Sequence, residues 1–100
     1  QHLQQQVAYT AAYANALSGL RLINVYIQHM PTHPNQTPQL QDFISLDTQI
    51  VGPISFKLLK TIDTIFAYSQ IQDAHCILKS TYTQTENNVI LSDISTYFGR

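Results

Sequence analysis

The hydrophobic positions of the first 30 residues repeat every three to four residues, which predicts one long helix. Ser18 and Gly19 interrupt this run, and we expect a slight change of face there because glycine costs roughly 1 kcal/mol against alanine inside a helix. Pro31 ends the helix, since the residue before a proline is disfavoured in the α conformation. The apolar positions of the predicted face are Leu3, Val7, Ala11, Ala14, Leu20, Ile23, Ile27 and Met30.

A proline-rich loop over residues 31–38 follows, because this stretch holds three prolines and no large apolar side chain. Thr37 and Pro38 suit the N-cap and the first turn of a short second helix that ends near Gly52. The next apolar face predicts a core helix over residues 53–67. Its positions are Ile54, Leu58, Ile62 and Ile65, with Leu59 and Phe66 beside them.

Two further helices are predicted in the last third of the chain. The run Ser69-Gln70-Ile71-Gln72 matches a capping box, which starts a fourth helix through Leu78. Asn87 or Asn88 caps a last helix that continues to Phe98. Sustained apolar/polar alternation is missing, although plentiful threonine and isoleucine keep a strand over residues 77–83 as an alternative.

The pattern as a whole therefore predicts an all-α fold, a small bundle of about five helices with a proline-rich loop after the long first helix. One hundred residues suit a single helical-bundle domain over residues 1–100. Because the sequence starts at Gln1 and stops at Arg100 where a periodic segment ends, we interpret it as a piece of a longer protein.

Composition narrows the function more than it narrows the fold. Only 11 of 100 residues are charged, and the net charge of −1 offers no attraction for a polyanion, so direct nucleic-acid binding is not expected. The 34 Gln, Thr, Ser and Asn residues replace the missing charge and suit a surface that meets another protein. No window of 18 apolar residues is present, so membrane insertion is not expected. A single cysteine favours a reducing compartment.

Candidate catalytic and metal-binding residues do not assemble into a site. His29 and His33 stand four apart, but Pro31 prevents the helix that would place both imidazoles on one face. His75 and Cys76 are neighbours, whose side chains diverge on a helix and cannot form a nucleophile–base pair. The aspartates are scattered singly, and the three glycines form no phosphate loop. We therefore expect no enzyme activity, no cofactor, no metal and no small-molecule substrate.

Three blocks resemble a known helical domain, the C-terminal domain of the COPII outer-coat rod subunit, which the steroid receptor RNA activator protein shares. The blocks are residues 16–26, with the spacing Arg-Leu-x-x-apolar-Tyr; residues 50–65, with a proline followed by a leucine-rich helix; and residues 67–78, with an aromatic turn and a His-x-x-apolar helix. Two features depart from the family: residues 31–49 lengthen a connection that is short there, and the last helix lacks the tryptophan and basic residues of the activator protein. The matched residues are interpreted as structural, and they are Arg21, Leu22, Tyr26, Pro53, Leu58, Ile62, Tyr68, Ala74, His75 and Ile77.

The resemblance implies a non-catalytic protein–protein interaction or scaffold module of the COPII coat in transport from the endoplasmic reticulum to the Golgi. Its partners would be other coat subunits, and its location would be the cytoplasm, at endoplasmic reticulum exit sites or on coated vesicles. The alternative is a nuclear coregulator or RNA-associated domain of the activator-protein type, against which the low count of basic residues argues.

Overall fold

The computed structural model describes residues 2–98 and contains a long helix followed by a five-stranded antiparallel sheet. The helical elements all precede the strands in the chain. They are α1 (His2–Arg21), α2 (Ile23–Tyr26), the 3₁₀-helix η1 (Ile27–His29) and α3 (Leu40–Ile44). The strands are β1 (Gln49–Val51), β2 (Ile54–Lys60), β3 (Thr64–Ile71), β4 (Ala74–Gln84) and β5 (Val89–Thr96).

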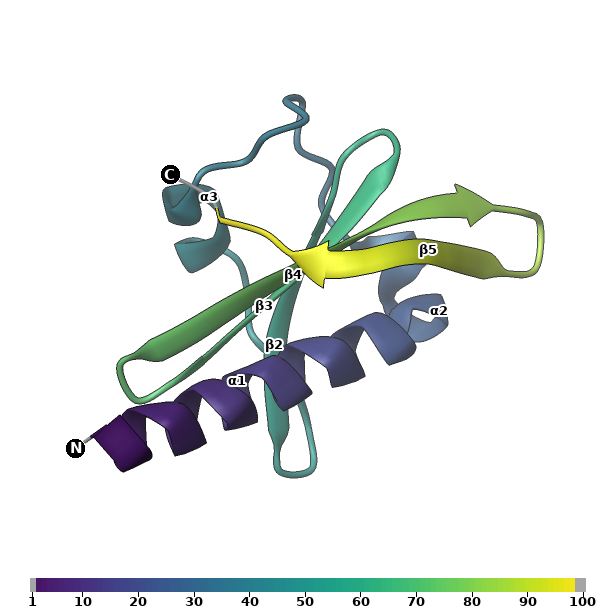
Figure 1. The fold of residues 1–100 in the computed structure, drawn as a ribbon. Helices are drawn as coiled ribbons and strands as arrows, with labels where there is room; N and C mark the ends of the chain where they lie inside the picture. Colours follow the sequence, from purple (N-terminus) through teal and green to yellow (C-terminus); the bar gives the residue numbers. More distant parts are fainter. Residues whose placement is uncertain (1, 99–100) are drawn as a thin grey trace.

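The sheet is a meander in which each strand pairs with the next one along the chain, in the order β1-β2-β3-β4-β5. Helix α1 lies across one face and packs on β2, β3 and β4, while α3 lies on the opposite side (Figure 1). The turns between the strands are short. Gly52 and Gln72 each adopt a positive φ, of 60° and 54°, at the first of two turn residues, which is the arrangement of type II′ hairpins.

Two apolar cores lie on the two faces of this sheet. The larger core joins α1 and η1 to the sheet, and the smaller core joins α3 to it. Residues of the larger core include Ala12, Ala16, Leu20, Ile23, Ile27, Phe56, Leu58, Ile65, Ala67, Cys76, Leu78 and Val89. The smaller core consists of Phe43, Leu59, Phe66, Tyr68 and Ile77, with Leu40, Leu46 and Tyr97 packed against it.

The predicted all-α bundle is therefore wrong from residue 49 onward. The segment predicted as a core helix over residues 53–67 is β2, a turn and the first half of β3. The predicted last helix, from Asn87 or Asn88, is β5, whereas the alternative strand over residues 77–83 is confirmed within β4. In β3 the side chains of both sheet faces are apolar, so no polar positions alternate along it. In β2 the residues Ile54-Ser55-Phe56-Lys57-Leu58 do alternate, and this strand signal was missed because Ile54 and Leu58 also have the spacing of one helix face.

The predicted capping box over residues 69–72 is the end of a strand. Ser69 Oγ donates a hydrogen bond of 2.9 Å to the Ser55 main-chain oxygen of β2, and it caps no helix. Gln72 lies in the β3–β4 turn. Serine followed three residues later by glutamine also fits the end of a strand and its turn, and here the Ser69 side chain bonds the neighbouring strand instead of a helix N-terminus.

The first half of the chain agrees better with the sequence pattern. A helix forms over α1 as predicted, but it ends at Arg21 and is continuous through Ser18 and Gly19, where a slight change of face was expected. The predicted apolar face is wrong in this helix: Val7 and Ala14 are exposed, and the buried positions are Ala8, Ala12, Ala16 and Leu20. Pro31 ends the helical region as expected, with Met30 extended at φ −79° and ψ 133°. The second helix is shorter than predicted and is capped by Gln39, not Thr37: Gln39 N–H donates to Asp42 Oδ2 at 2.7 Å.

Candidate functional site

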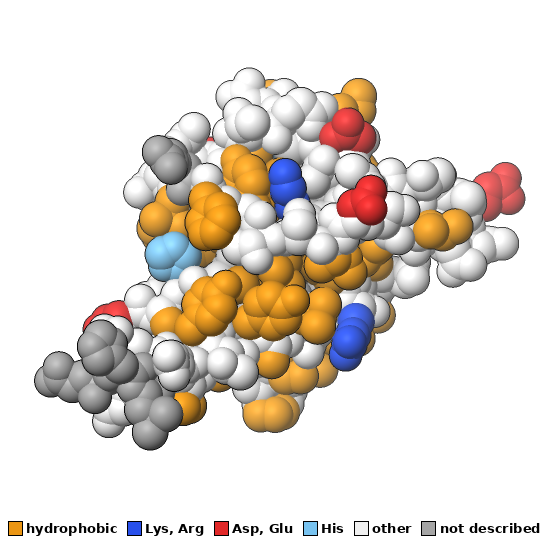
Figure 2. Space-filling model, viewed as in Figure 1, with side chains coloured by type: hydrophobic (Ala, Val, Ile, Leu, Met, Phe, Trp, Pro, Cys, Tyr) orange, Lys and Arg blue, Asp and Glu red, His pale blue; other side chains and the backbone are white. Residues whose placement is uncertain are grey.

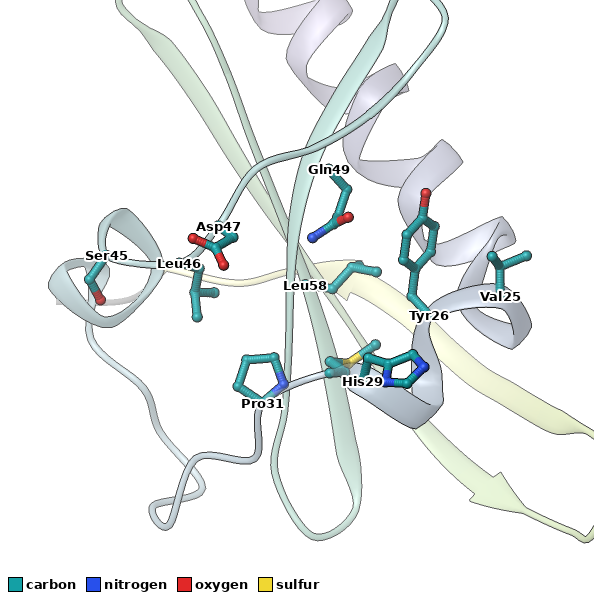
Figure 3. Close-up of a pocket in the computed structure, with 10 residues that line it drawn as sticks. Val25, Tyr26, His29, Pro31, Ser45, Leu46, Asp47, Gln49 and Leu58 are labelled. Carbon is teal, nitrogen blue, oxygen red and sulfur yellow. The ribbon is translucent and has the colours of Figure 1, made fainter.

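A cavity of about 640 Å³ opens beside the middle of strand β2 (Figure 3). Three parts of the chain enclose it: the α2–η1 region with Pro31, the segment that follows α3, and β2 itself. This volume falls within the range of small-ligand pockets. Its lining residues are Val25, Tyr26, His29, Met30, Pro31, Ser45, Leu46, Asp47, Gln49 and Leu58.

The floor of the cavity is a place where the edge of β2 changes pairing partner. Strand β1 is only three residues long, and its pairing with β2 reaches no further than Gln49 opposite Phe56. At the far end of β2, Lys60 takes a different partner: its N–H donates to the Pro31 oxygen at 3.1 Å, and its oxygen accepts from His33 N–H at 2.8 Å. Leu58 lies between these two pairings.

The main chain of Leu58 faces the cavity. Along an antiparallel strand, successive residues direct their N–H and C=O groups to opposite sides. Lys60 directs its groups to the outer edge, and so does Phe56 opposite β1, so Leu58 must do the same. Among the described residues, neither β1 nor the Pro31–His33 segment pairs with it. The cavity therefore offers a strand-type donor and acceptor at its floor.

The cavity walls combine apolar side chains with the polar side chains of His29, Ser45, Asp47 and Gln49. Tyr26 stands edge-on to Phe56, with ring centroids 5.6 Å apart, and this contact holds its ring at the α2 wall. Met30 and Leu58 are buried, and Leu46 is half-buried on the opposite wall. Gln49 lies beside Leu58 on the side of β2 that also holds Tyr26 and His29, whereas Asp47 lies across β2 with Ser45 and Leu46 (Figure 3). Such a lining can bind and orient an extended, partly apolar group.

The polar residues of the cavity do not form a nucleophile and base. Ser45 Oγ donates to the Asp42 main-chain oxygen at 3.2 Å, and no hydrogen bond joins Ser45 to His29 in the described part of the chain. His33, the other histidine of this region, is half-buried and lies 3.2 Å from Asp42 Oδ2, an ion pair when it is protonated. Within residues 2–98, no three His, Cys, Asp or Glu side chains gather as metal ligands would.

His75 and Cys76 face opposite sides of the sheet, because neighbours on a strand alternate. His75 is exposed and stacks on Tyr68 with ring centroids 6.0 Å apart. Cys76 is buried in the larger core, with its Sγ 3.9 Å from Tyr9 Oη. Burial raises the pKa of the Cys76 thiol, which keeps it in the less reactive protonated form.

Cys76 is expected to react with iodoacetamide far more slowly in the folded protein than in denaturant. Burial raises the pKa of the Cys76 thiol in the folded protein above its value in the unfolded chain. The contribution of Cys76 to the free energy of unfolding is therefore fully present below the unfolded pKa and is lost as the pH rises through the folded pKa. Alkylation followed by mass spectrometry, in buffer and in urea at one alkaline pH, measures the difference. Equal rates in both solutions would contradict the buried placement.

The residues matched to the helical family do not converge on one site. Tyr26 and Leu58 line the cavity, whereas the others are spread over both cores and the surface. Leu58, Tyr68 and Ile77 are buried on strands, and Ile62, expected on a core face, is 79% exposed in the β2–β3 turn. Arg21, Pro53 and His75 are exposed, and Leu22 and Ala74 are half-buried. The helices that were to carry Leu58, Ile62, Tyr68, Ala74, His75 and Ile77 are strands and turns.

Sequence reasoning missed the cavity residues His29, Met30, Leu46, Asp47 and Gln49 as a group. They come from two segments, the end of η1 and the chain after α3, and only their pairing with β2 brings them together. The signal available in the sequence was the loop of residues 31–38 followed by a weakly helical stretch, which leaves an irregular segment beside an element edge.

The fold defines a class, a long helix packed on a five-stranded antiparallel meander with a cavity at one sheet edge. Comparison with protein-family models, curated proteins and solved structures finds no match for this chain. No helix within residues 2–98 has the length and apolar character needed to span a bilayer.

Proposed function

We propose that this chain is a non-catalytic protein-interaction domain that binds an extended peptide segment of a partner protein in the cavity beside Leu58. The observation that carries the proposal is the outward-facing main chain of Leu58 at the floor of a cavity that has apolar side chains on both walls. A peptide group supplies both the acceptor and the donor that such a position can bind, and recognition by strand addition uses these bonds for affinity.

The walls determine which peptide fits. Side chains alternate along an extended segment, so a residue paired with Leu58 would place its own side chain on the face of Leu58 and Tyr26, and both of its neighbours would point toward the Leu46 wall. These walls favour apolar side chains, and Asp47 favours a neutral or cationic residue at the rim over an acidic one. The proposed partner segment is therefore short, extended and apolar at its centre.

The vesicle-coat role and the alternative nuclear or RNA-associated role stay predictions from the sequence. Both came with a helical bundle, which this chain does not form. The proposed function has a protein as the partner, as the sequence-based prediction did, and the bound segment is defined by its extended shape and apolar side chains. A cytoplasmic location also stays a prediction, favoured by the single cysteine.

Selection of a displayed library of random linear peptides tests the proposal. We expect peptides that bind the wild-type chain and lose binding to Gln49→Trp, because a bulkier side chain there fills the space above Leu58. The matched control is Ile50→Trp, on the same strand at a side chain that is 72% exposed and outside the cavity. Peptides that bind all three proteins equally would contradict the cavity as the site.

Amide hydrogen exchange provides a second readout on the same peptides. In the free protein, the Leu58 amide should exchange faster than those of Leu59 and Lys60, since Leu59 pairs with Phe66 of β3 and Lys60 N–H donates to Pro31. A bound peptide should slow exchange at Leu58 and leave Leu59 unchanged. Protection of Leu58 equal to that of Leu59 in the free protein would remove the basis of the proposal.

A further inference from the structure

The opposite edge of the sheet, formed by strand β5, carries a second set of main-chain groups. Strand β5 is the last in the sheet order, and helix α1 packs on β2, β3 and β4 instead of on β5. At its start, Val89 N–H donates to Asn24 Oδ1 at 2.8 Å, so α2 caps the first position of this edge. Beyond Val89, no other strand lies along this edge in the described residues.

The second half of β5 directs two residues outward. Tyr97 N–H donates to the Ile77 oxygen of β4 at 2.8 Å, and Thr96 lies opposite Leu78. By alternation, Ser95 faces β4, whereas Ile94 and Thr96 direct their main-chain groups to the outer edge. Asp93, with φ of 60°, lies where the β4–β5 register shifts and separates this half from the first.

The side chains around this half are mostly apolar, and its charged neighbours are Asp93 and Lys79, which lies opposite Ser95 on β4 with its Nζ over the Tyr97 ring. Hydrophobic side chains gather in a band between helix α1 and strand β5 (Figure 2). The side chain of Ile94 is 46% exposed, that of Phe98 79% and that of Tyr9 43%. A cavity lined by Tyr9 and Phe98 lies between the helix and the end of the strand. Arg21 is the one Lys, Arg, Asp or Glu residue of α1, and Asp93 is the one in β5.

We propose that this edge pairs with the same edge of a second copy of the chain, antiparallel and with Ser95 on the twofold axis. In this register, Ile94 of each copy exchanges both main-chain hydrogen bonds with Thr96 of the other, and one sheet runs through both copies. Asp93 then faces Tyr97 of the other copy, so no two like charges meet. An identical strand is the simplest source of the required donor and acceptor spacing, and a chain with net charge −1 repels its copy only weakly.

The self-pairing edge and the peptide cavity lie at opposite edges of the sheet, so the two proposals can fail separately. Sedimentation of the whole chain over a range of concentrations should show a reversible dimer. Ile94→Lys should raise the dissociation constant by at least about tenfold, because lysine on an edge strand opposes pairing. The matched control, Ile50→Lys on β1 at the other edge, should dimerise like the wild type.

A monomer at every concentration up to the solubility limit would overturn the proposal, as would a dimer that Ile94→Lys leaves unchanged. If circular dichroism shows that Ile94→Lys does not fold, amide exchange of the wild-type chain decides. Exchange at Ile94 and Thr96 should slow as the protein concentration rises, whereas exchange at Leu58 should stay constant. Concentration-independent exchange at Ile94 and Thr96 would overturn the proposal.

Discussion

Replacing Phe43 with alanine is expected to lower the free energy of unfolding by about 3–5 kcal/mol. Phe43 is fully buried at the centre of the smaller core, with its ring centroid 5.7 Å from that of Phe66, 6.1 Å from Tyr68 and 6.3 Å from Tyr97. Helix α3 has only five residues and is too short to hold together by itself. Phe43 is its main apolar attachment to the sheet, so the substitution should release α3 and leave a cavity.

Urea unfolding followed by circular dichroism measures this loss. The matched control is Ile44→Ala, the next residue of the same helix, whose side chain is 47% exposed. It should cost less than about 1 kcal/mol, since most surface substitutions have small effects. If both variants lost similar stability, α3 would not be attached through Phe43.

Replacing Gly19 with alanine is expected to destabilise the protein by about 1–3 kcal/mol, although alanine is the better helix former by roughly 1 kcal/mol. A Cβ at this position would lie 2.8 Å from Cγ and Cδ1 of Phe56, a buried ring that cannot move freely. Gly19 therefore allows α1 to approach β2 closely, which is a packing reason for glycine at this position of the helix. The change of face predicted at this position rested on the low helix propensity of glycine alone.

A double-mutant cycle separates these two effects. Phe56→Leu alone should destabilise by removing core contacts, but it should reduce the additional cost of Gly19→Ala by relieving the clash. Ala14→Gly, at an exposed position of the same helix, measures the propensity term and should cost about 1 kcal/mol. A Gly19→Ala variant more stable than the wild type would contradict the close approach.

Helix α1 and the loop after it could be predicted because their signals are local. Alanine and other good helix formers fill α1, although its buried face of Ala8, Ala12, Ala16 and Leu20 is not the predicted one, and Pro31 ends the helical region for a steric reason. The strands could not be separated from helices on spacing alone. Ile54 and Leu58 are four apart, which places them on one face of a helix, but an even spacing also places them on one face of a strand.

The longest apolar run shows the same ambiguity. Ile65, Phe66, Ala67 and Tyr68 are all buried, and they alternate between the two cores of the sheet. A strand covered on both faces shows no polar alternation, so it reads like one side of a buried helix. The high proportion of isoleucine, threonine and aromatic residues was the signal that favoured strands.

The cavity beside Leu58 could not be predicted from the sequence, for a different reason. Its floor depends on where β1 stops pairing with β2 and where the Pro31–His33 segment starts to pair with it, and both are set by tertiary structure. Tyr26 and Leu58 were singled out on a resemblance, and their meeting in one cavity follows from a fold that the resemblance did not imply. The loop of residues 31–38 indicated an irregular segment, but it did not indicate which residues would line a cavity.

The contact between Tyr97 and the loop has a consequence for folding during synthesis. Tyr97 Oη donates a hydrogen bond of 2.7 Å to the Pro38 oxygen, and its ring packs on Phe43 and Phe66. The smaller core therefore lacks one of its walls until residue 97 has left the ribosome. Helix α1 forms early from local contacts, yet its apolar face must wait for β2, β3 and β4. A nascent chain of this domain holds an uncovered helix for most of its synthesis and closes both cores only at the end.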